Sequence, residues 1–241
     1  MKKLNTILVL ALLVCSVGTT ALVAATKMHN TETEEKNVGS FKGIASGGPI
    51  AVMVTMGNTE SVRIEGDEDA LADLITEVKE GVLIIRPKTK WGEWSRKYRK
   101  PQVTVFIKAK KINSLTMSGS GSIEVANSIN SSDLVVTLNG SGSITASATV
   151  KTFRGDVNRS GTLKMSGKSI NSNLTLSGSG NFEGKKFTAT ELSVQISGSA
   201  NAYIKVTTNI DAVISGSGNV LYSGNPSVKK TIIGSGNVSK W

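Results

Sequence analysis

Residues 173–182 read Asn-Leu-Thr-Leu-Ser-Gly-Ser-Gly-Asn-Phe, and this short stretch recurs with variations through the second half of the chain. With its second glycine, Gly180, taken as an anchor, the equivalent residues are Gly121, Gly142, Gly161, Gly180, Ala200, Gly218 and Gly236. The intervals between successive anchors are 21, 19, 19, 20, 18 and 18 residues. A period near 19 residues predicts a repeat architecture, in which each copy forms one structural unit.

Two columns of apolar residues accompany the anchors. Four residues before them lie Met117, Leu138, Val157, Leu176, Ile196, Ile214 and Ile232. Two residues after them lie Ile123, Ile144, Leu163, Phe182, Ala202, Val220 and Val238. The residue directly before each anchor is serine, and the residue directly after it is Ser, Thr or Asn. This pattern indicates a strand, a small polar corner and a return to the core in every copy.

The segments before the corners alternate between apolar and polar residues, as half-buried strands do; residues 192–196, Leu-Ser-Val-Gln-Ile, are an example. Coils stacked about 4.8 Å apart would place apolar ladders inside and Ser/Asn ladders at the corner. A flexible Ser/Gly linker is the alternative, but a linker would not keep two apolar columns in register. We therefore predict an all-β protein in which residues 111–241 form seven β-solenoid coils of 18–21 residues.

The preceding residues, 40–110, belong to the same domain (40–241) but have a less regular pattern. Residues 44–50, Ile-Ala-Ser-Gly-Gly-Pro-Ile, are predicted to be an eighth copy, with Ile44 and Ile50 in the two apolar columns. Alternating apolar residues predict further strands at 50–56, 61–65, 82–86 and 103–108.

One helix is predicted over residues 68–80 of this part. Its apolar residues form a single stripe at helical spacing, namely Leu71, Leu74, Ile75 and Val78. Asp67 is a suitable N-cap, and Gly81 is placed to end the helix. Such a helix would pack against the solenoid as an insertion or an end cap.

The first 25 residues have the pattern of an export signal. Lys2 and Lys3 precede an apolar core, and cleavage is predicted after Ala25, so that the mature chain begins at Thr26 without lipid. The alternative is a lipoprotein attached through Cys15, although Val14 stands where lipoprotein signals have a small residue. Residues 26–39 are expected to be a flexible polar leader. The mature chain has no stretch long enough to predict a membrane span.

The composition argues against common catalytic and metal sites. His29, the single histidine, lies in the leader, and the mature chain has no cysteine, so we predict neither a catalytic triad, a cofactor nor a metal site. The coils contain six carboxylates, Glu124, Asp133, Asp156, Glu183, Glu191 and Asp211, which we expect to lie at different offsets from their anchors. Glycosidases need two carboxyl groups about 5–9.5 Å apart on one face. The sequence therefore predicts a protein that is not an enzyme.

The formal charge of +10 falls to +8 when Lys2 and Lys3 are removed with the signal. Nucleic acid is not an expected partner of an exported chain, whereas acidic glycans are. Residues 86–100 combine basic and aromatic side chains, and the candidate ligand-binding residues are Trp91, Trp94, Arg96, Lys97, Tyr98, Arg99 and Lys100. The alternative is a hairpin whose tryptophans pack on the solenoid while its lysines remain solvated.

These features together resemble the putative auto-transporter adhesin, head GIN domain family. The resemblance covers residues 40–238 and rests on the signal, the early Ser-Gly-Gly coil, the short predicted helix, the basic Trp-containing segment and the repeated Ser-Gly-Ser-Gly-Asn corners. It implies an exported protein of the type common in Bacteroidetes, a right-handed parallel β-helix, surface binding and no established enzymatic activity. The chain has no Gly-Ile-Asn tripeptide; its nearest equivalents are Gly-Asn-Val at 218–220 and 236–238.

Three functions follow as hypotheses. The first is a binding, adhesin-like module in the periplasm, on the outer-membrane surface or outside the cell, with an acidic glycan or another surface component as partner. The alternative is a structural envelope component that forms homo-oligomers, because an uncapped coil exposes strand edges. A carbohydrate-active enzyme is disfavoured by the scattered carboxylates.

Overall fold

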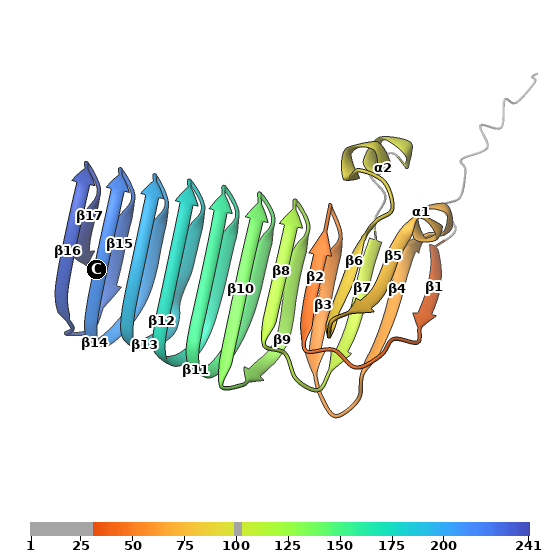
Figure 1. Ribbon diagram of the computed structural model, residues 1–241, viewed down its shortest axis with the longest axis horizontal. Coiled ribbons are helices and arrows are strands. Elements are labelled where there is room, and N and C mark those ends of the chain that lie inside the picture. Colours follow the sequence, from red (N-terminus) through yellow and green to blue (C-terminus); the bar gives the residue numbers. More distant parts are fainter. Residues whose placement is uncertain (1–30, 99–102) are drawn as a thin grey trace, which may run out of the picture.

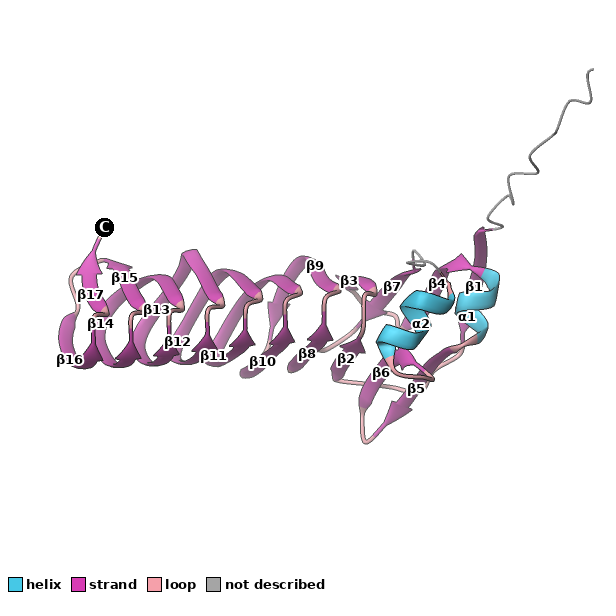
Figure 2. Cartoon of the chain, turned by 90° about the horizontal axis from the view of Figure 1, so that it is seen from above, coloured by secondary structure: helices cyan, strands magenta, loops and turns pink. Residues whose placement is uncertain are grey.

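The computed structural model describes residues 31–98 and 103–241, most of which form a β-solenoid of about seven turns (Figure 1). Two walls of parallel strands enclose the core (Figure 2). The front wall contains β2 (Gly43–Gly47), β8 (Ser114–Gly119), β10 (Asp133–Gly140) and β16 (Ser227–Gly234). The back wall contains β3 (Ala51–Met56), β9 (Ser122–Asn130), β15 (Asn219–Ser223) and β17 (Asn237–Lys240). Four long strands run first through the back wall and then through the front wall: β11 (Ser143–Arg159), β12 (Thr162–Gly178), β13 (Asn181–Gly198) and β14 (Asn201–Gly216). The predicted all-β solenoid is confirmed.

Both apolar columns run through the core in the predicted register. Leu138 lies between Met117 and Val157 in the front wall, and Ile144 lies between Ile123 and Leu163 in the back wall. These side chains are buried, because each coil covers the apolar residues of its neighbours.

The two glycine positions of the Ser-Gly-Ser-Gly corners are needed for different reasons. The first, such as Gly198, adopts a positive φ of 113° that L-residues rarely adopt. The second, such as Gly142, lies so close to the next coil that a Cβ would come within 2.4 Å of the Gly121 carbonyl oxygen. The corner also contains the predicted ladder of side chains, in which Asn219 Nδ2 donates to Asn201 Oδ1 at 2.9 Å.

The early coil, β2 and β3, is present but does not lie at the end of the stack. It is inserted between two coils that follow it in sequence, because β2 pairs with both β8 and β6 (Val82–Pro87), and β3 pairs with both β9 and β7 (Val103–Ala109). The predicted register of this coil is wrong by two residues: Ser46, not Ile44, lies opposite Met117, and Val52 lies opposite Ile123. A shift of two keeps the same side chains inward, so the alternation alone could not exclude it.

The predicted helix over 68–80 is wrong beyond its first turns. Helix α1 covers only Glu68–Ala72, with Asp67 as its N-cap residue, and strand β5 (Leu74–Lys79) follows it. β5 pairs antiparallel with β6 through a tight turn in which Glu80 and Gly81 both have positive φ. Leu74 and Val78 share a face in a strand as they do in a helix, and the free edge of β6 supplies the hydrogen bonds that favour the strand.

The second half of the predicted flexible leader also forms a strand. β1 (Thr31–Lys36) pairs antiparallel with β4 (Ser61–Asp67), which itself pairs antiparallel with β7. The prediction of a flexible leader is therefore wrong for residues 31–36, because β4 offers an edge that the sequence pattern did not reveal. The predicted signal peptide, Cys15 and His29 lie outside the described residues. The four further strands are confirmed as β3, β4, β6 and β7.

Candidate functional site

The basic aromatic segment, residues 86–100, contains a helix and not the hairpin that was the alternative to a binding site. Helix α2 (Trp91–Lys97) stands where the other coils have a Ser/Gly corner, between β6 and β7 (Figure 1). Glu93 lies in its first turn, and Arg96 and Lys97 lie in its last, which complements the helix dipole. Trp94 is fully buried and packs edge-on against Tyr98, with 5.9 Å between the ring centroids. Its indole therefore offers no exposed face to a sugar.

Asp73 connects this helix to the turn between α1 and β5. Lys97 Nζ donates to Asp73 Oδ2 at 2.7 Å, and the Tyr98 hydroxyl donates a short hydrogen bond to the same oxygen. These hydrogen bonds hold the pKa of Asp73 below its usual value and raise the pKa of Lys97 above its own. The pKa of Tyr98 is raised, chiefly by burial and to a smaller extent by its hydrogen bond to Asp73.

The predicted site is therefore only partly available to a ligand. Trp94 and Tyr98 contribute to packing, and Lys97, although exposed, is paired with Asp73. Arg96 is exposed and donates to the backbone oxygen of Gly92 at 3.3 Å. The Trp91 side chain, Arg99 and Lys100 lie outside the described residues. Ligand binding by residues 86–100 stays a prediction.

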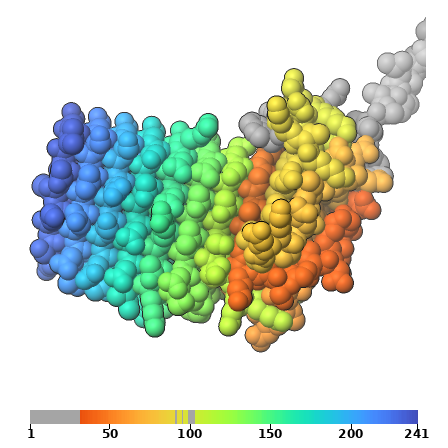
Figure 3. Space-filling view, viewed as in Figure 1, coloured from red at the N-terminus to blue at the C-terminus, as the bar shows by residue number. Residues whose placement is uncertain are grey.

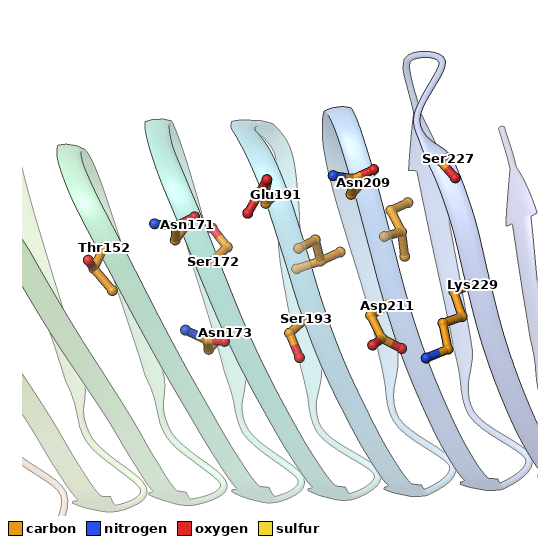
Figure 4. Close-up of a pocket in the computed structure, with 12 residues that line it drawn as sticks. Thr152, Asn171, Ser172, Asn173, Glu191, Ser193, Asn209, Asp211, Ser227 and Lys229 are labelled. Atoms are coloured by element: carbon orange, nitrogen blue, oxygen red, sulfur yellow. The ribbon is translucent and has the colours of Figure 1, made fainter.

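A second candidate surface lies on the front wall, where successive coils form adjacent bands (Figure 3). Polar side chains point outward in two ladders across neighbouring coils (Figure 4). The first ladder contains Thr152, Asn171, Glu191, Asn209 and Ser227, and the second contains Asn173, Ser193, Asp211 and Lys229. These nine residues, which we call the ladder face, line a hollow of about 600 Å³.

The ladder face keeps its hydrogen-bonding capacity for other molecules. Within the described part of the chain, none of its nine side chains has a hydrogen-bond partner or an ion-pair partner. The sheet nevertheless fixes their spacing, because equivalent residues lie one strand spacing apart, about 4.8 Å. Sequence reasoning missed this face because its outward residues differ from coil to coil, whereas the repeat search looked for identical ones.

The carboxylates are less scattered than predicted. Glu124 and Glu183 occupy one column, separated by Thr145 and Lys164 in the two intervening coils. Glu191 and Asp211 lie diagonally on the ladder face, because Glu191 is opposite Asn209 and Asp211 is opposite Ser193. Both side chains are exposed, whereas the catalytic acid of a glycosidase is enclosed by its site. This arrangement favours ligand contact over hydrolysis.

The described ranges contain no cluster of three or more Asp, Glu, His or Cys residues that could hold a metal ion. Likewise, neither α1 nor α2 is long and apolar enough to cross a membrane.

The fold is a parallel β-solenoid whose front wall is polar and contains a shallow hollow, and this fold defines the class of protein. The chain belongs to the putative auto-transporter adhesin, head GIN domain family, whose sequence model matches residues 40–226. The resemblance noted from the corners is thereby confirmed. No curated protein matches the chain.

Solved structures from Bacteroides and Parabacteroides species have the same fold. A putative adhesin from Bacteroides fragilis aligns with a TM-score of 0.78 at 19% identity, over 88% of this chain and 97% of that one. A putative lipid binding protein from Parabacteroides distasonis aligns with a TM-score of 0.72 at 23% identity, over 88% and 97% of the two chains. A putative adhesin from Parabacteroides merdae aligns with a TM-score of 0.66 at 18% identity, over 88% and 96%. At these identities the likeness shows the fold alone.

Proposed function

We propose that this protein is an exported, non-enzymatic, adhesin-like binding protein that attaches to an extended surface polymer through its ladder face. The family and the pattern of residues 1–25 support export to the cell envelope or surface. The observation that carries the binding role is the ladder face itself. Its exposed polar side chains are spaced by the sheet and are not engaged with one another.

The chemistry of this face suits a hydroxyl-rich polymer such as a surface polysaccharide. Asn171, Asn173 and Asn209 offer both donors and acceptors, and Glu191 and Asp211 accept hydrogen bonds from hydroxyl groups. Because the ladder face repeats along the solenoid, one polysaccharide molecule would contact several coils at once, so that weak single contacts add up.

The test is a glycan array probed with the mature protein and with the double variant Asn171→Ala/Asn173→Ala. Losing two amides from the ladder face should weaken saccharide binding by about thirtyfold, since each hydrogen bond contributes roughly 1 kcal/mol. The matched control, Asn113→Ala/Asn130→Ala, removes two exposed amides elsewhere and should bind like the parent. Equal binding by both double variants would assign the binding to another surface.

The structural alternative has one observation in its favour. Among the described strands, β16 pairs only with β14 and β17 pairs only with β15, so each leaves one edge unpaired. However, Lys229 and Lys230 lie on β16, and lysines on an edge strand discourage pairing with an identical edge. Light scattering across a hundredfold range of protein concentration should therefore find no assembly through this edge; a mass that rises with concentration would favour the structural role.

A further inference from the structure

The back wall contains an irregularity that the front wall lacks. Opposite β12, Glu183 pairs with Lys164 and Lys186 pairs with Ser166, so β13 has one residue more than its neighbour at this place. Opposite β14, Gly184 pairs with Ile204 and Thr188 pairs with Lys205, which leaves residues 185–187 of β13 without a counterpart. β13 therefore contains a bulge, a feature that often redirects side chains near functional sites.

Packing inside the coil fixes this bulge. Phe182 and Phe187 both point into the core and contact Phe153, with ring centroids 6.0 and 5.1 Å from that of Phe153. Gly184 allows this arrangement, because a Cβ at this position would lie 2.3 Å from the Phe182 ring. As a result, Lys185 and Lys186 are consecutive in sequence and both are exposed, which the alternation of a regular strand would prevent.

Beside the bulge lies a groove of about 590 Å³. Lys164, Lys185 and Lys186 line it together with Glu183 and Tyr203, and buried Met165 lies at its base. None of the three lysines forms an ion pair within the described residues. With one carboxylate among them, their charges leave the groove with a net charge of +2.

Aromatic surface adjoins these charges. Lys185 Nζ lies 4.9 Å from the centroid of the Tyr203 ring, and the ring of Trp241 lies 6.3 Å from it on the side of the last coil. Trp241 is 46% exposed, so part of its indole is open to a ligand. The combination of stacking surface and cations that the sequence suggested for residues 86–100 is thus assembled here from distant residues.

The formal charge is also distributed unevenly along the chain, with most of the positive charge on the coils. Residues 31–102 contain twelve carboxylates and eleven Lys or Arg residues, a formal charge of −1. Residues 103–241 contain fourteen Lys or Arg residues and six carboxylates, a formal charge of +8. An anion approaching the protein is therefore attracted to the solenoid, where the groove lies, rather than to the part that contains α2.

We propose that this groove binds an anionic saccharide. Lys164, Lys185 and Lys186 contact its sulfate, uronate or phosphate groups, and Tyr203 with Trp241 packs against a sugar ring. The site is on the back wall and is separate from the ladder face, so it stands or falls independently of the proposed function above.

The probes are dextran sulfate, uncharged dextran and linear polyphosphate, each titrated against the full mature protein. The double variant Lys185→Ala/Lys186→Ala should weaken binding of dextran sulfate by about tenfold at low salt, since two solvent-exposed charge pairs are lost. The matched control, Lys110→Ala/Lys111→Ala, removes two other consecutive exposed lysines, which lie outside both the groove and the ladder face, and should bind like the parent. Binding by the parent should weaken as salt is raised.

Equal losses in the two double variants would overturn the proposal, because they would mean attraction to overall charge only. Trp241→Ala tests the saccharide contact: it should weaken binding of dextran sulfate several-fold and leave binding of polyphosphate unchanged. A loss for both polymers would overturn that part. Should Lys185→Ala/Lys186→Ala lose its far-ultraviolet circular dichroism signal, Lys164→Ala on the regular strand β12 replaces it with the same expectation. The ladder-face variant Asn171→Ala/Asn173→Ala should bind dextran sulfate normally, so failure of one proposal is distinguishable from failure of the other.

Discussion

The regular coils and the N-terminal part of this molecule cover their strands in different ways. In residues 111–241 each parallel strand is covered by the next copy of itself, and a Ser/Gly corner brings the coils within backbone hydrogen-bonding distance. In residues 31–109, α2 replaces a corner, and three antiparallel strands, β1, β4 and β5, cover the end of the stack (Figure 2). Repetition makes a uniform rod, whereas its end requires residues that differ from the repeat.

The two regions also differ in net charge and in the partners of their polar side chains. The N-terminal part, residues 31–102, has a formal charge of only −1, and it engages Lys97 through Asp73 and Lys88 through the Ala72 carbonyl oxygen, which lies 2.6 Å from Lys88 Nζ. The coils are basic, and many of their polar side chains have no partner among the described residues. The N-terminal part is therefore stabilised by contacts between particular side chains, whereas the coils are stabilised by the apolar columns that they share.

The largest effect is expected where a column is broken. Ile196→Asp places an unpaired charge in the core between Leu176 and Ile214, and it should destabilise the protein by about 4 kcal/mol or more. Gln195→Asp, on the exposed face of the same strand, should change stability by less than about 0.5 kcal/mol. Asn201→Asp at the corner removes the donor to Asn181 and should cost about 1 kcal/mol. Urea unfolding measures all three, and equal tolerance would contradict the register of the columns.

A second prediction tests whether the N-terminal part opens by itself. Trp94→Ala leaves a cavity under α2 and should lower the local stability there by about 3 kcal/mol. Hydrogen exchange should accelerate in α2, β5 and β6 but not in β12 to β14, because contacts in a solenoid extend only to adjacent coils. Acceleration in all coils together would show that the two regions unfold as one unit.

The corner column offers a matched pair of changes. Gly198→Ala introduces a Cβ about 2.5 Å from the Gly178 carbonyl oxygen at a positive φ, and should cost about 2 kcal/mol. Arg159 occupies the equivalent place in its own coil with φ of 86°, so Arg159→Gly should stabilise the protein by about 0.5 kcal/mol. Thermal unfolding of the two variants should shift in opposite directions; a loss in Arg159→Gly would mean that the arginine side chain contributes more than its strain removes.

The smallest effect concerns the attachment of α2. The pKa of Asp73 is lowered, so its ion pair contributes fully above the usual value of 3.8 and is lost as pH falls through the lowered pKa. The pKa of Lys97 is raised, so its contribution is full below 10.5 and is lost only as pH rises through the raised value. The nuclear magnetic resonance signal of the Trp94 indole should therefore stay constant between about pH 5 and pH 9 and shift below pH 4. Asp73→Asn should shift the signal at neutral pH and abolish the acid transition; an unchanged acid transition would exclude Asp73 as its cause.

The sequence by itself determined the seven coils, their register and their corners. Each column occurs seven times in the sequence, so one misplaced residue does not obscure the pattern, and every coil meets a neighbour that has apolar residues at the same offsets. The same argument explains the Asn ladder, since Asn201 and Asn219 are equivalent by position alone.

Only the tertiary structure decided the rest, because it depends on pairings that occur once. The insertion of β2 between β6 and β8, and the strand at residues 74–79 in place of a helix, follow from which edges are free in three dimensions. For the candidate sites, local composition pointed to Trp94, which the fold buries. The back-wall groove joins Lys164, Lys185 and Tyr203, which lie up to 39 positions apart in sequence and meet because coils stack and one strand bulges around Gly184. A sequence pattern reports what repeats, whereas a binding surface is made by the side chains that differ from coil to coil.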